Sequence, residues 1–287
     1  MKPRERIESS FSQRIAWVTG AGSGIGRALV IQLLDAGAWV VASDINEASL
    51  AALRADLSDA ARTRLELAPL DVTDADAFAA IGADLRARHG HVDYLFNNAG
   101  VGVGGEASSI PAAQWREMIE VNVIGVMNGV HAVYPAMIAR GAGHLVNFGS
   151  IAGLVPLPAE VPYSASKHAV VGMSRSLALE AKVHGVKVTT VCPGKIETPM
   201  YDSSPIYGID KAALLRLIPE GVSAEACAAE ILDGVARGKE MVLITKLAVF
   251  MHHLHRLAPA LMTFLLSRYL VKIRSSSQAA TAAQGRA

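Results

Sequence analysis

Short apolar runs alternate with longer amphipathic segments along most of the chain. Continuous apolar runs of this length predict buried strands, and apolar positions repeated every three to four residues predict helices. We expect strands at about residues 14–19, 39–43, 64–70, 92–96, 144–150, 186–191 and 240–245. Strands that alternate with helices predict an α/β fold, with one doubly wound parallel sheet of about seven strands flanked by helices.

The composition fits one domain of this kind. The chain has 287 residues, of which 51% are hydrophobic and 18% charged, enough to bury a sizeable core. A formal net charge of +1 gives no reason to expect nucleic acid as a partner. Cys192 and Cys227 form neither a metal-binding spacing nor a disulfide framework, which fits a reducing, cytoplasmic location.

Both ends of the chain depart from the alternating pattern. The first fourteen residues are charged and lack the apolar segment of a secretory signal, so we expect a polar lead-in to the first strand. Residues 1–245 are expected to form a single domain with its core at about residues 12–245. Residues 246–274 predict an apolar helical extension, and residues 275–287 are low in complexity and predict a disordered tail.

A glycine cluster lies between the first predicted strand and the helix that follows it. Its members are Gly20, Ala21, Gly22, Ser23, Gly24, Ile25 and Gly26. Glycines permit positive φ and close approach of a ligand, and a helix N-terminus directs amides and positive dipole at a pyrophosphate. A structural turn is also glycine-rich, but a strand before the cluster and a helix after it favour a dinucleotide-binding loop.

Asp44 ends the second predicted strand, eighteen residues after Gly26. An acid at this distance is placed to bind the ribose hydroxyls of an adenosine. Its carboxylate would repel a 2′-phosphate, and Ile45 and Asn46 follow it where a basic residue could have stood. The pattern predicts NAD(H) over NADP(H), whereas Asn46 itself fits a helix cap.

Polar and small residues also follow later strands. They are Asp71 and Val72 after the third strand, and Asn97, Asn98, Ala99 and Gly100 after the fourth. Amides beside small residues leave room and hydrogen-bonding groups for a ligand, although an asparagine-rich turn looks the same. Asn122 lies inside a segment predicted to be helical from residue 111 to about 140, where asparagine is a poor helix former. This misfit indicates either a function or a local distortion.

The segment from Ser150 to Lys167 carries the candidate chemistry. Ser150 ends an apolar run, so its hydroxyl would emerge at the carboxyl end of a strand, where open parallel sheets bind ligands. If the next segment is helical, Tyr163 and Lys167 lie on one face, four residues apart. An ammonium near a phenol favours the phenolate, so Tyr163 could exchange protons closer to neutral pH. Tyrosine and lysine at this spacing are common on helix surfaces, so the pair depends on its context.

Taken together, the motifs resemble the short-chain dehydrogenase/reductase family in its single-domain form, over roughly residues 12–245. The resemblance rests on the order and spacing of Thr19 to Gly26, Asp71-Val72, Asn97 to Gly100, Asn122, Ser150, Tyr163-Ser164-Ala165-Ser166-Lys167 and Pro193-Gly194 with Thr198. It implies a Rossmann-type catalytic domain that uses a nicotinamide cofactor.

The resemblance implies a catalytic role for each of four residues. Tyr163 would be the general acid/base, and Lys167 would lower the tyrosine pKa and hold the nicotinamide ribose. Ser150 would hydrogen-bond the substrate oxygen, and the main chain of Asn122 would hold a water that connects the lysine to solvent. General acid–base catalysis contributes roughly 10²–10⁴-fold, and positioning of the reactants supplies much of the rest.

The resemblance also implies a set of cofactor contacts and no metal. The loop from Gly20 to Gly26 would cover the pyrophosphate, and Asp44 would bind the adenosine ribose. The other implied contacts are Asp71 and Val72 at the adenine, Asn98, Ala99 and Gly100 at the adjoining ribose, and Pro193, Gly194, Ile196 and Thr198 towards the nicotinamide. Family members that use NADP(H) often carry a basic residue where Ser23 and Ile45 stand here, which again favours NAD(H).

The apolar extension at residues 246–274 leaves several interpretations open. No apolar run in it approaches the ~20 residues of a membrane span. Its three clustered histidines, at positions 252, 253 and 255, have no carboxylate or cysteine beside them and do not predict a metal site. The extension could pack on the body, form a subunit interface or cover an apolar substrate pocket. It could also bind a membrane surface, since apolar residues of an amphipathic helix are flanked by Arg256, Arg268, Lys272 and Arg274. Family members with similar tails act on steroids, retinoids or other lipids.

We therefore expect an NAD(H)-dependent dehydrogenase that interconverts a secondary alcohol and a ketone on a hydrophobic, steroid-, retinoid- or lipid-like substrate. The mixed apolar segment at residues 198–219 is placed to form a lid. The alternative is a non-catalytic dinucleotide-binding regulator or scaffold, although such relatives typically lack one of Ser150, Tyr163 and Lys167. The family implies a homodimer or homotetramer, and the extension adds a candidate peripheral membrane contact.

Overall fold

A seven-stranded parallel sheet forms the centre of the computed structural model, which describes residues 1–284. The strand order is β11-β7-β6-β4-β1-β2-β3, and every neighbouring pair is parallel. The strands are β1 (Ile15–Thr19), β2 (Trp39–Ser43), β3 (Leu65–Leu67), β4 (Tyr94–Asn97), β6 (Gly143–Phe148), β7 (Val186–Pro193) and β11 (Met241–Ile244). The α/β fold with a doubly wound sheet is confirmed.

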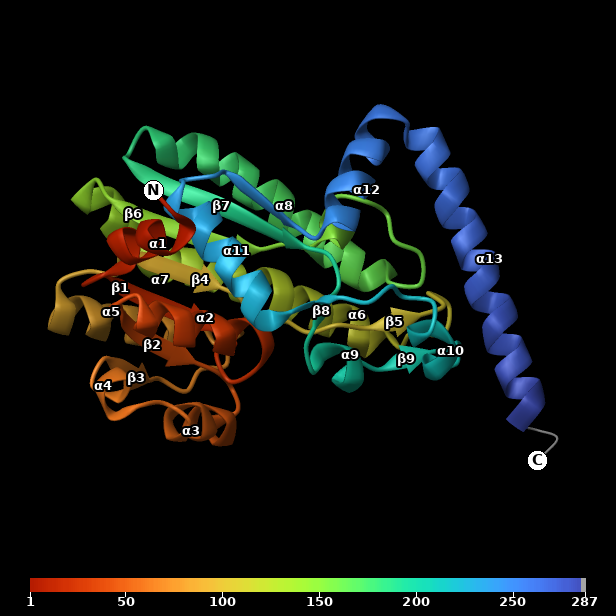
Figure 1. Ribbon diagram of the computed structural model, residues 1–287, viewed down its shortest axis with the longest axis horizontal. Helices are drawn as coiled ribbons and strands as arrows, with labels where there is room; N and C mark the ends of the chain where they lie inside the picture. Colours follow the sequence, from red (N-terminus) through yellow and green to blue (C-terminus); the bar gives the residue numbers. More distant parts are fainter. Residues whose placement is uncertain (285–287) are drawn as a thin grey trace.

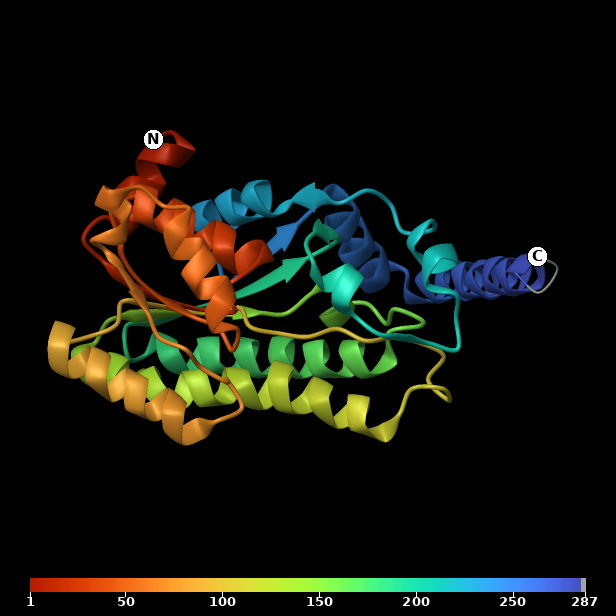
Figure 2. The same cartoon turned by 90° about the horizontal axis from the view of Figure 1, so that it is seen from below.

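Helices cover both faces of the sheet (Figures 1 and 2). One face carries α1 (Pro3–Phe11), α2 (Gly24–Asp35), α3 (Glu47–Ala55), α4 (Asp59–Arg62) and α11 (Ala224–Ala236). The other carries α5 (Ala75–His89), α6 (Ala112–Ile119), the π-helical turn η1 (Glu120–Ile124), α7 (Gly125–Arg140) and α8 (Val161–Lys182). Successive side chains of a strand point to opposite faces, so Ala16 and Val18 join one buried cluster while Trp17 joins the other.

The polar lead-in to β1 forms a helix, which the sequence interpretation had not specified. Glu5 accepts a hydrogen bond from the backbone N–H of Lys2 at 3.0 Å, which closes the first turn of α1. Phe11 is fully buried, and its ring centroid lies 4.7 Å from that of Tyr94. Arg6 also forms an ion pair with Asp233 of α11. These contacts fix a charged helix that its own composition did not predict.

One helical segment, Ala112–Arg140, is long and apolar enough to cross a membrane by length and composition, among the residues that the structure describes. Its α7 part contributes Val133 and Met137 to the buried cluster on one face of the sheet, which is the behaviour of a core helix. The segment therefore belongs to the packing of the domain.

The substrate side of the sheet is built from short elements between the main strands. They are β5 (Gly104–Gly105), the 3₁₀ turn η2 (Ile151–Gly153), β8 (Ile196–Glu197), α9 (Met200–Ser203), β9 (Ile206–Tyr207), α10 (Lys211–Leu215) and β10 (Val222–Ser223). Strand β9 pairs with β5, and β10 pairs with β8. Residues 198–219 thus lie against the loop after β4, as a lid would.

The C-terminal extension consists of two helices, α12 (Lys246–Leu257) and α13 (Pro259–Gln284). Both views show α13 at one end of the molecule, beside the lid and away from the sheet (Figures 1 and 2). The helix continues through residues 275–284, which differs from the disorder expected there, while residues 285–287 lie outside the described residues. Pro259 begins α13, a position where its missing N–H costs no hydrogen bond.

Candidate active site

The glycine loop takes a conformation that depends on its glycines. Gly20 and Gly24 have φ angles of 64° and 50°, values that favour glycine. A β-carbon at Gly26 would lie 2.0 Å from the carbonyl oxygen of Gly20, so the loop closes tightly onto the first turn of α2. A β-carbon at Gly22 would likewise meet the Asp44 carboxylate, at 3.0 Å. The N-terminus of α2 is thereby left open to a ligand.

Thr19 and Asn98 hold this loop against the end of β4. The Thr19 hydroxyl oxygen accepts hydrogen bonds from the backbone N–H groups of Asn98 and Ala99, both at 3.1 Å. The Asn98 amide donates to the carbonyl oxygens of Thr19 and Gly20 at 2.9 and 3.2 Å. The strand order reverses between β1 and β4, and the crevice at such a point is where doubly wound sheets bind ligands.

Asp44 lies at the carboxyl end of β2, beside the loop. Its carboxylate accepts hydrogen bonds from the backbone N–H groups of Gly22 and Asn46, both at 2.9 Å. The side chain of Asn46 caps α3 by accepting from the Ser49 amide, as predicted. Ile45, the next residue after Asp44, is 71% exposed and offers an apolar surface at the mouth of the crevice.

The remaining predicted cofactor residues lie along the same edge of the sheet. Val72 and Ala99 line one small cavity together with Thr19. A β-carbon at Gly24 would lie 3.0 Å from the side chain of Thr198, so the residue that follows β8 lies close to the glycine loop. The other predicted members, Asp71, Gly100, Pro193, Gly194 and Ile196, fall in or beside the strands and loops that end at this edge.

Ser150, Tyr163 and Lys167 come together at the carboxyl end of β6. Ser150 is buried and caps η2, accepting from the Ala152 N–H at 3.1 Å. The Lys167 ammonium donates to the carbonyl oxygen of Phe148 at 3.0 Å and lies 5.7 Å from the ring centroid of Tyr163. A lysine fixed by a strand carbonyl is held in place relative to the tyrosine one helical turn before it.

The pKa values of this group differ from the sequence expectation. Burial raises the pKa of Tyr163 to about 12; the Ser150 side chain opposes the rise, and the charge of Glu160 adds to it. Burial lowers the pKa of Lys167 to about 8. The expected lowering of the Tyr163 pKa by Lys167 is thus absent in the free protein, where desolvation of the phenol has the largest effect and the ammonium lies 5.7 Å from the ring centroid.

Asn122 lies in the π-helical turn between α6 and α7. Its side chain is fully buried, and its amide donates to the Val101 carbonyl and the Ser166 hydroxyl, both at 3.0 Å. Its side-chain oxygen accepts from the Val101 N–H at 2.9 Å. Asn122 therefore ties the loop after β4 to α8, and its misfit to a helix marks a local distortion of the kind often found at functional sites. The proposed water-holding role of its main chain stays a prediction.

The side of Tyr163 that faces the lid is mostly apolar. It packs against a buried cluster of Val103, Ile110 and Met118, and Trp115 of α6 and Tyr207 of β9 pack against the same cluster. Lys211 holds the lid together by donating to the carbonyl oxygen of Ser204 at 2.9 Å. An apolar wall around a single acid/base group suits an apolar substrate.

Glu160 is an exception to this apolar lining that the sequence interpretation missed. It precedes α8 and is half-buried, and among the side chains of residues 1–278 it has no hydrogen-bond or ion-pair partner. Burial raises its pKa to about 7. Burial also raises the pKa values of Tyr201 and Tyr269, and the charge of Glu160 raises both further. The carboxyl group therefore lies where α8, the lid and α13 meet. The signal available in the sequence was an acid three residues before Tyr163.

A second missed contact joins α13 to the loop after β4. The Arg274 guanidinium donates to both carboxylate oxygens of Glu106, at 2.6 and 2.8 Å. Further along, the Ser277 hydroxyl accepts from the backbone N–H of Asp210 at 2.8 Å. The extension is thus attached to two loops that surround the substrate side of Tyr163.

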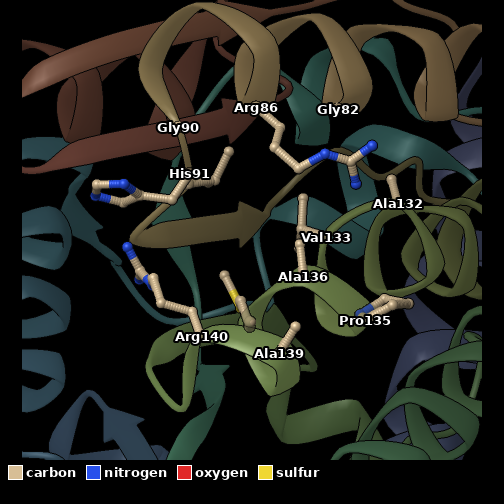
Figure 3. Close-up of a pocket in the computed structure, with 12 residues that line it drawn as sticks. Gly82, Arg86, Gly90, His91, Ala132, Val133, Pro135, Ala136, Ala139 and Arg140 are labelled. Carbon is tan, nitrogen blue, oxygen red and sulfur yellow. The ribbon is translucent and has the colours of Figure 1, made fainter.

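A hollow of about 500 Å³ lies elsewhere, between α5 and α7 (Figure 3). Arg86, His91 and Arg140 are among the side chains that line it, and none of the predicted site residues does. It opens at the edge of the sheet opposite to Ser150, so it does not belong to the candidate site. Among residues 1–284, no group of three or more His, Cys, Asp or Glu side chains is arranged to hold a metal ion.

The fold and the site define a nucleotide-binding oxidoreductase with a Rossmann-type sheet. The family model described as short chain dehydrogenase matches residues 14–205. SadH of Mycobacterium tuberculosis, which is named as an oxidoreductase, is 35% identical over 242 residues, 82% of this chain and 87% of SadH. The chain therefore belongs to the short-chain dehydrogenase/reductase family.

Solved structures agree with this assignment. A short-chain dehydrogenase/reductase of Burkholderia phymatum, in complex with NAD, is 28% identical with a TM-score of 0.78, covering 88% of this chain and 96% of that one. A short-chain dehydrogenase of Burkholderia cenocepacia, in complex with NADP, is 25% identical with a TM-score of 0.76, covering 90% and 98%. Similar proteins thus bind either cofactor.

Proposed function

We propose that this enzyme interconverts a secondary alcohol and a ketone on a hydrophobic substrate, with NAD(H) as cofactor and Tyr163 as general acid/base. The observation that carries the proposal is the placement of Ser150, Tyr163 and Lys167 at the carboxyl end of β6, on the same edge as the glycine loop. No observation favours the non-catalytic alternative.

In this proposal each protein group has a defined task. Ser150 donates to the substrate oxygen and orients the carbinol carbon. The Tyr163 phenolate would accept the hydroxyl proton as the carbinol C–H bond breaks. A nicotinamide cofactor held by the glycine loop and Asp44 would supply the hydride acceptor. Lys167 stabilises the phenolate and binds the nicotinamide ribose. Because the pKa of Tyr163 is about 12 in the free protein, its phenol is protonated at neutral pH. The positive charge of Lys167 or of an oxidised nicotinamide beside the phenol would lower this pKa and favour the reactive phenolate.

NAD(H) is proposed because of the surroundings of Asp44. Its carboxylate already accepts two backbone hydrogen bonds, which fix it at the ribose end of the crevice. These hydrogen-bond partners, the backbone N–H groups of Gly22 and Asn46, carry no charge, and no lysine or arginine among the described side chains forms an ion pair with Asp44. A 2′-phosphate would therefore meet repulsion that nothing nearby offsets.

The proposed substrate is steroid-, retinoid- or lipid-like. Support comes from the apolar wall around Tyr163 and from the inward side of α13, where Met262 and Ile273 are only 2% and 1% exposed. We also propose a cytoplasmic homodimer or homotetramer in which the extension contacts a membrane. Light scattering of the purified protein would give its mass in solution.

Replacing Tyr163 by Phe tests the chemistry. We expect the variant to lose at least 10²-fold in kcat with an alcohol and NAD, because general acid–base catalysis contributes about that much. NADH affinity, measured by fluorescence titration, should stay within about twofold. Tyr134→Phe, in α7, is the matched control and should keep full activity. If Tyr163→Phe turned over like the parent protein, the assigned mechanism would be wrong.

A further inference from the structure

Helix α13 is apolar on two opposite sides, and only one of them is covered. Met262, Leu266 and Ile273 pack against the loop around η2 and the lid. The other side presents a stripe at helical spacing, the outer stripe, whose members are all exposed: Leu261, Phe264, Leu265, Arg268, Val271 and Lys272. Phe264 and Val271 are each 59% exposed. Large apolar side chains grouped on one helix face normally meet a partner.

The exposed side of α12 continues this pattern. Val249, Phe250 and Leu257 are exposed there, together with the cationic Lys246 and Arg256. Both views place the two helices at the same end of the molecule, with the far side of α13 facing away from the body (Figures 1 and 2). The apolar surface is therefore continuous in chain order from α12 into α13.

The charge of this surface has one sign. Residues 246–287 contain no aspartate or glutamate. Of the lysines and arginines on α12 and on α13 as far as residue 278, only Arg274 forms an ion pair, with Glu106. Burial lowers the pKa of His252, and the positive charges of His253, Arg256 and Arg175 lower it further, as expected where cations are not offset by acids.

We infer that the outer stripe and the exposed side of α12 form a docking surface for an anionic lipid bilayer. The N-terminal half of the stripe is apolar and suits insertion at the headgroup boundary. Arg268 and Lys272 stand in its C-terminal half and suit contact with anionic headgroups, worth about a factor of five each. The helix would thus lie along the bilayer surface with the lid and the substrate side of Tyr163 close to it.

A second copy of the chain fits this surface less well. Two such faces would bring Arg256, Arg268 and Lys272 of both copies together with no acid on either face to offset them. A bilayer with anionic lipid provides both an apolar layer and the missing negative charge. This inference rests on the membrane contact in the proposed function and does not involve the proposed dehydrogenase reaction. If the protein does not bind vesicles, the proposed reaction is unaffected.

The test is co-sedimentation of the full-length protein with vesicles of phosphatidylcholine alone or of phosphatidylcholine and phosphatidylglycerol in equal parts. We expect binding to the anionic vesicles in 0.1 M salt, since the Debye length there is about 10 Å, and marked loss in high salt. Two double variants separate the contributions. Leu261→Gln with Leu265→Gln should bind at least tenfold more weakly, and Arg268→Gln with Lys272→Gln roughly 30-fold more weakly.

Matched controls carry the same changes on other faces. Leu179→Gln with Val183→Gln removes an apolar residue of α8 and the apolar residue that follows the helix, which are 74% and 81% exposed. Arg54→Gln with Lys182→Gln removes two exposed cations. Both controls should bind vesicles like the parent protein. Thermal unfolding and NADH titration show that every variant is folded.

Three results would overturn the inference. The parent protein could remain in the supernatant with anionic vesicles, or the stripe variants could bind as tightly as the controls. Light scattering could also show that the stripe variants convert a parent dimer to monomers while no form binds vesicles, which would make the surface a subunit interface. Binding that is lost in both stripe variants and kept in both controls supports the inference.

Discussion

Replacing Glu160 by Gln should stabilise the protein at alkaline pH and leave it unchanged at acid pH. Glu160 is half-buried near Tyr163, Tyr201 and Tyr269, and the described side chains of residues 1–278 provide no partner for its charge. Burial raises its pKa to about 7. A charge held without a partner in such a place costs free energy that a neutral amide of the same shape avoids.

The sign and size follow from proton linkage. The unfolded chain releases the Glu160 proton near pH ~4.3, whereas the folded protein keeps it until about pH 7. The folded state therefore binds more protons in this window, and stability falls as pH rises through it. One pKa unit corresponds to about 1.4 kcal/mol, so the full cost above pH 7 is about 4 kcal/mol. Partial exposure of the side chain reduces this cost to about 1–3 kcal/mol.

The assay is unfolding of the parent and Glu160→Gln proteins at pH 4.5 and pH 8.5. A gain of about 1–3 kcal/mol at pH 8.5 corresponds to a Tm higher by roughly 2–6 °C for a chain of this size, with no difference at pH 4.5. Glu230→Gln, which changes an exposed acid of α11, should show no pH-dependent gain. Equal behaviour of Glu160→Gln and the parent at pH 8.5 would refute the reasoning, and so would a gain of the same size at both pH values.

The same substitution has a catalytic consequence. The charge of Glu160 contributes to the raised pKa of Tyr163, so its removal should lower that pKa. In the oxidation direction the phenolate is the reactive form, and the rise of kcat/KM with pH should therefore shift to lower pH in Glu160→Gln. If the stability changed but the pH profile of kcat/KM did not shift, Glu160 would affect the stability of the fold and not the proton transfer by Tyr163.

Three further predictions concern the cofactor and the extension. Gly26→Ala should abolish NADH binding or folding because its β-carbon would lie 2.0 Å from a loop carbonyl, whereas Gly172→Ala, which meets nothing within 4 Å, should bind NADH normally. Asp44→Ala should reduce the ratio of kcat/KM for NAD to that for NADP at least tenfold; an unchanged ratio would contradict the assigned role. Arg274→Gln should speed hydrogen exchange in α13 without changing the sheet, since it breaks the two hydrogen bonds to Glu106; unchanged exchange would show that apolar packing alone holds the helix.

The sequence predicted the sheet well because the strands are buried on both faces and stand out as apolar runs. All seven appear in the structure, and β2 has the predicted bounds. Helix α1 was not predicted because most of its residues are polar or charged, although Ile7 and Phe11 lie one turn apart and face the core. Its stability comes from contacts with β4 and α11, which no local pattern reveals.

The site was predicted unevenly for a related reason. Motif spacing placed Ser150, Tyr163 and Lys167 together because helix and strand geometry fix such positions. Motif spacing could not predict the pKa values, since these depend on burial by residues distant in the chain. Glu160 shows this most clearly, because its neighbours Tyr201 and Tyr269 lie on the lid and on α13.

The extension connects these observations. The inner side of α13 packs on the lid, and Arg274 and Ser277 bind the loops at Glu106 and Asp210, so the position of α13 and that of the lid are linked. If the outer stripe binds a bilayer, the membrane favours whichever lid position holds α13 flat against it. Coupling of this kind is reciprocal, so a substrate analogue that closes the lid should change vesicle affinity by the same factor by which vesicles change analogue affinity. Measuring both affinities in the parent and in Arg274→Gln would show whether the Arg274–Glu106 contact carries that coupling. If it does, the factor for vesicle affinity and the factor for analogue affinity should both approach one in the variant.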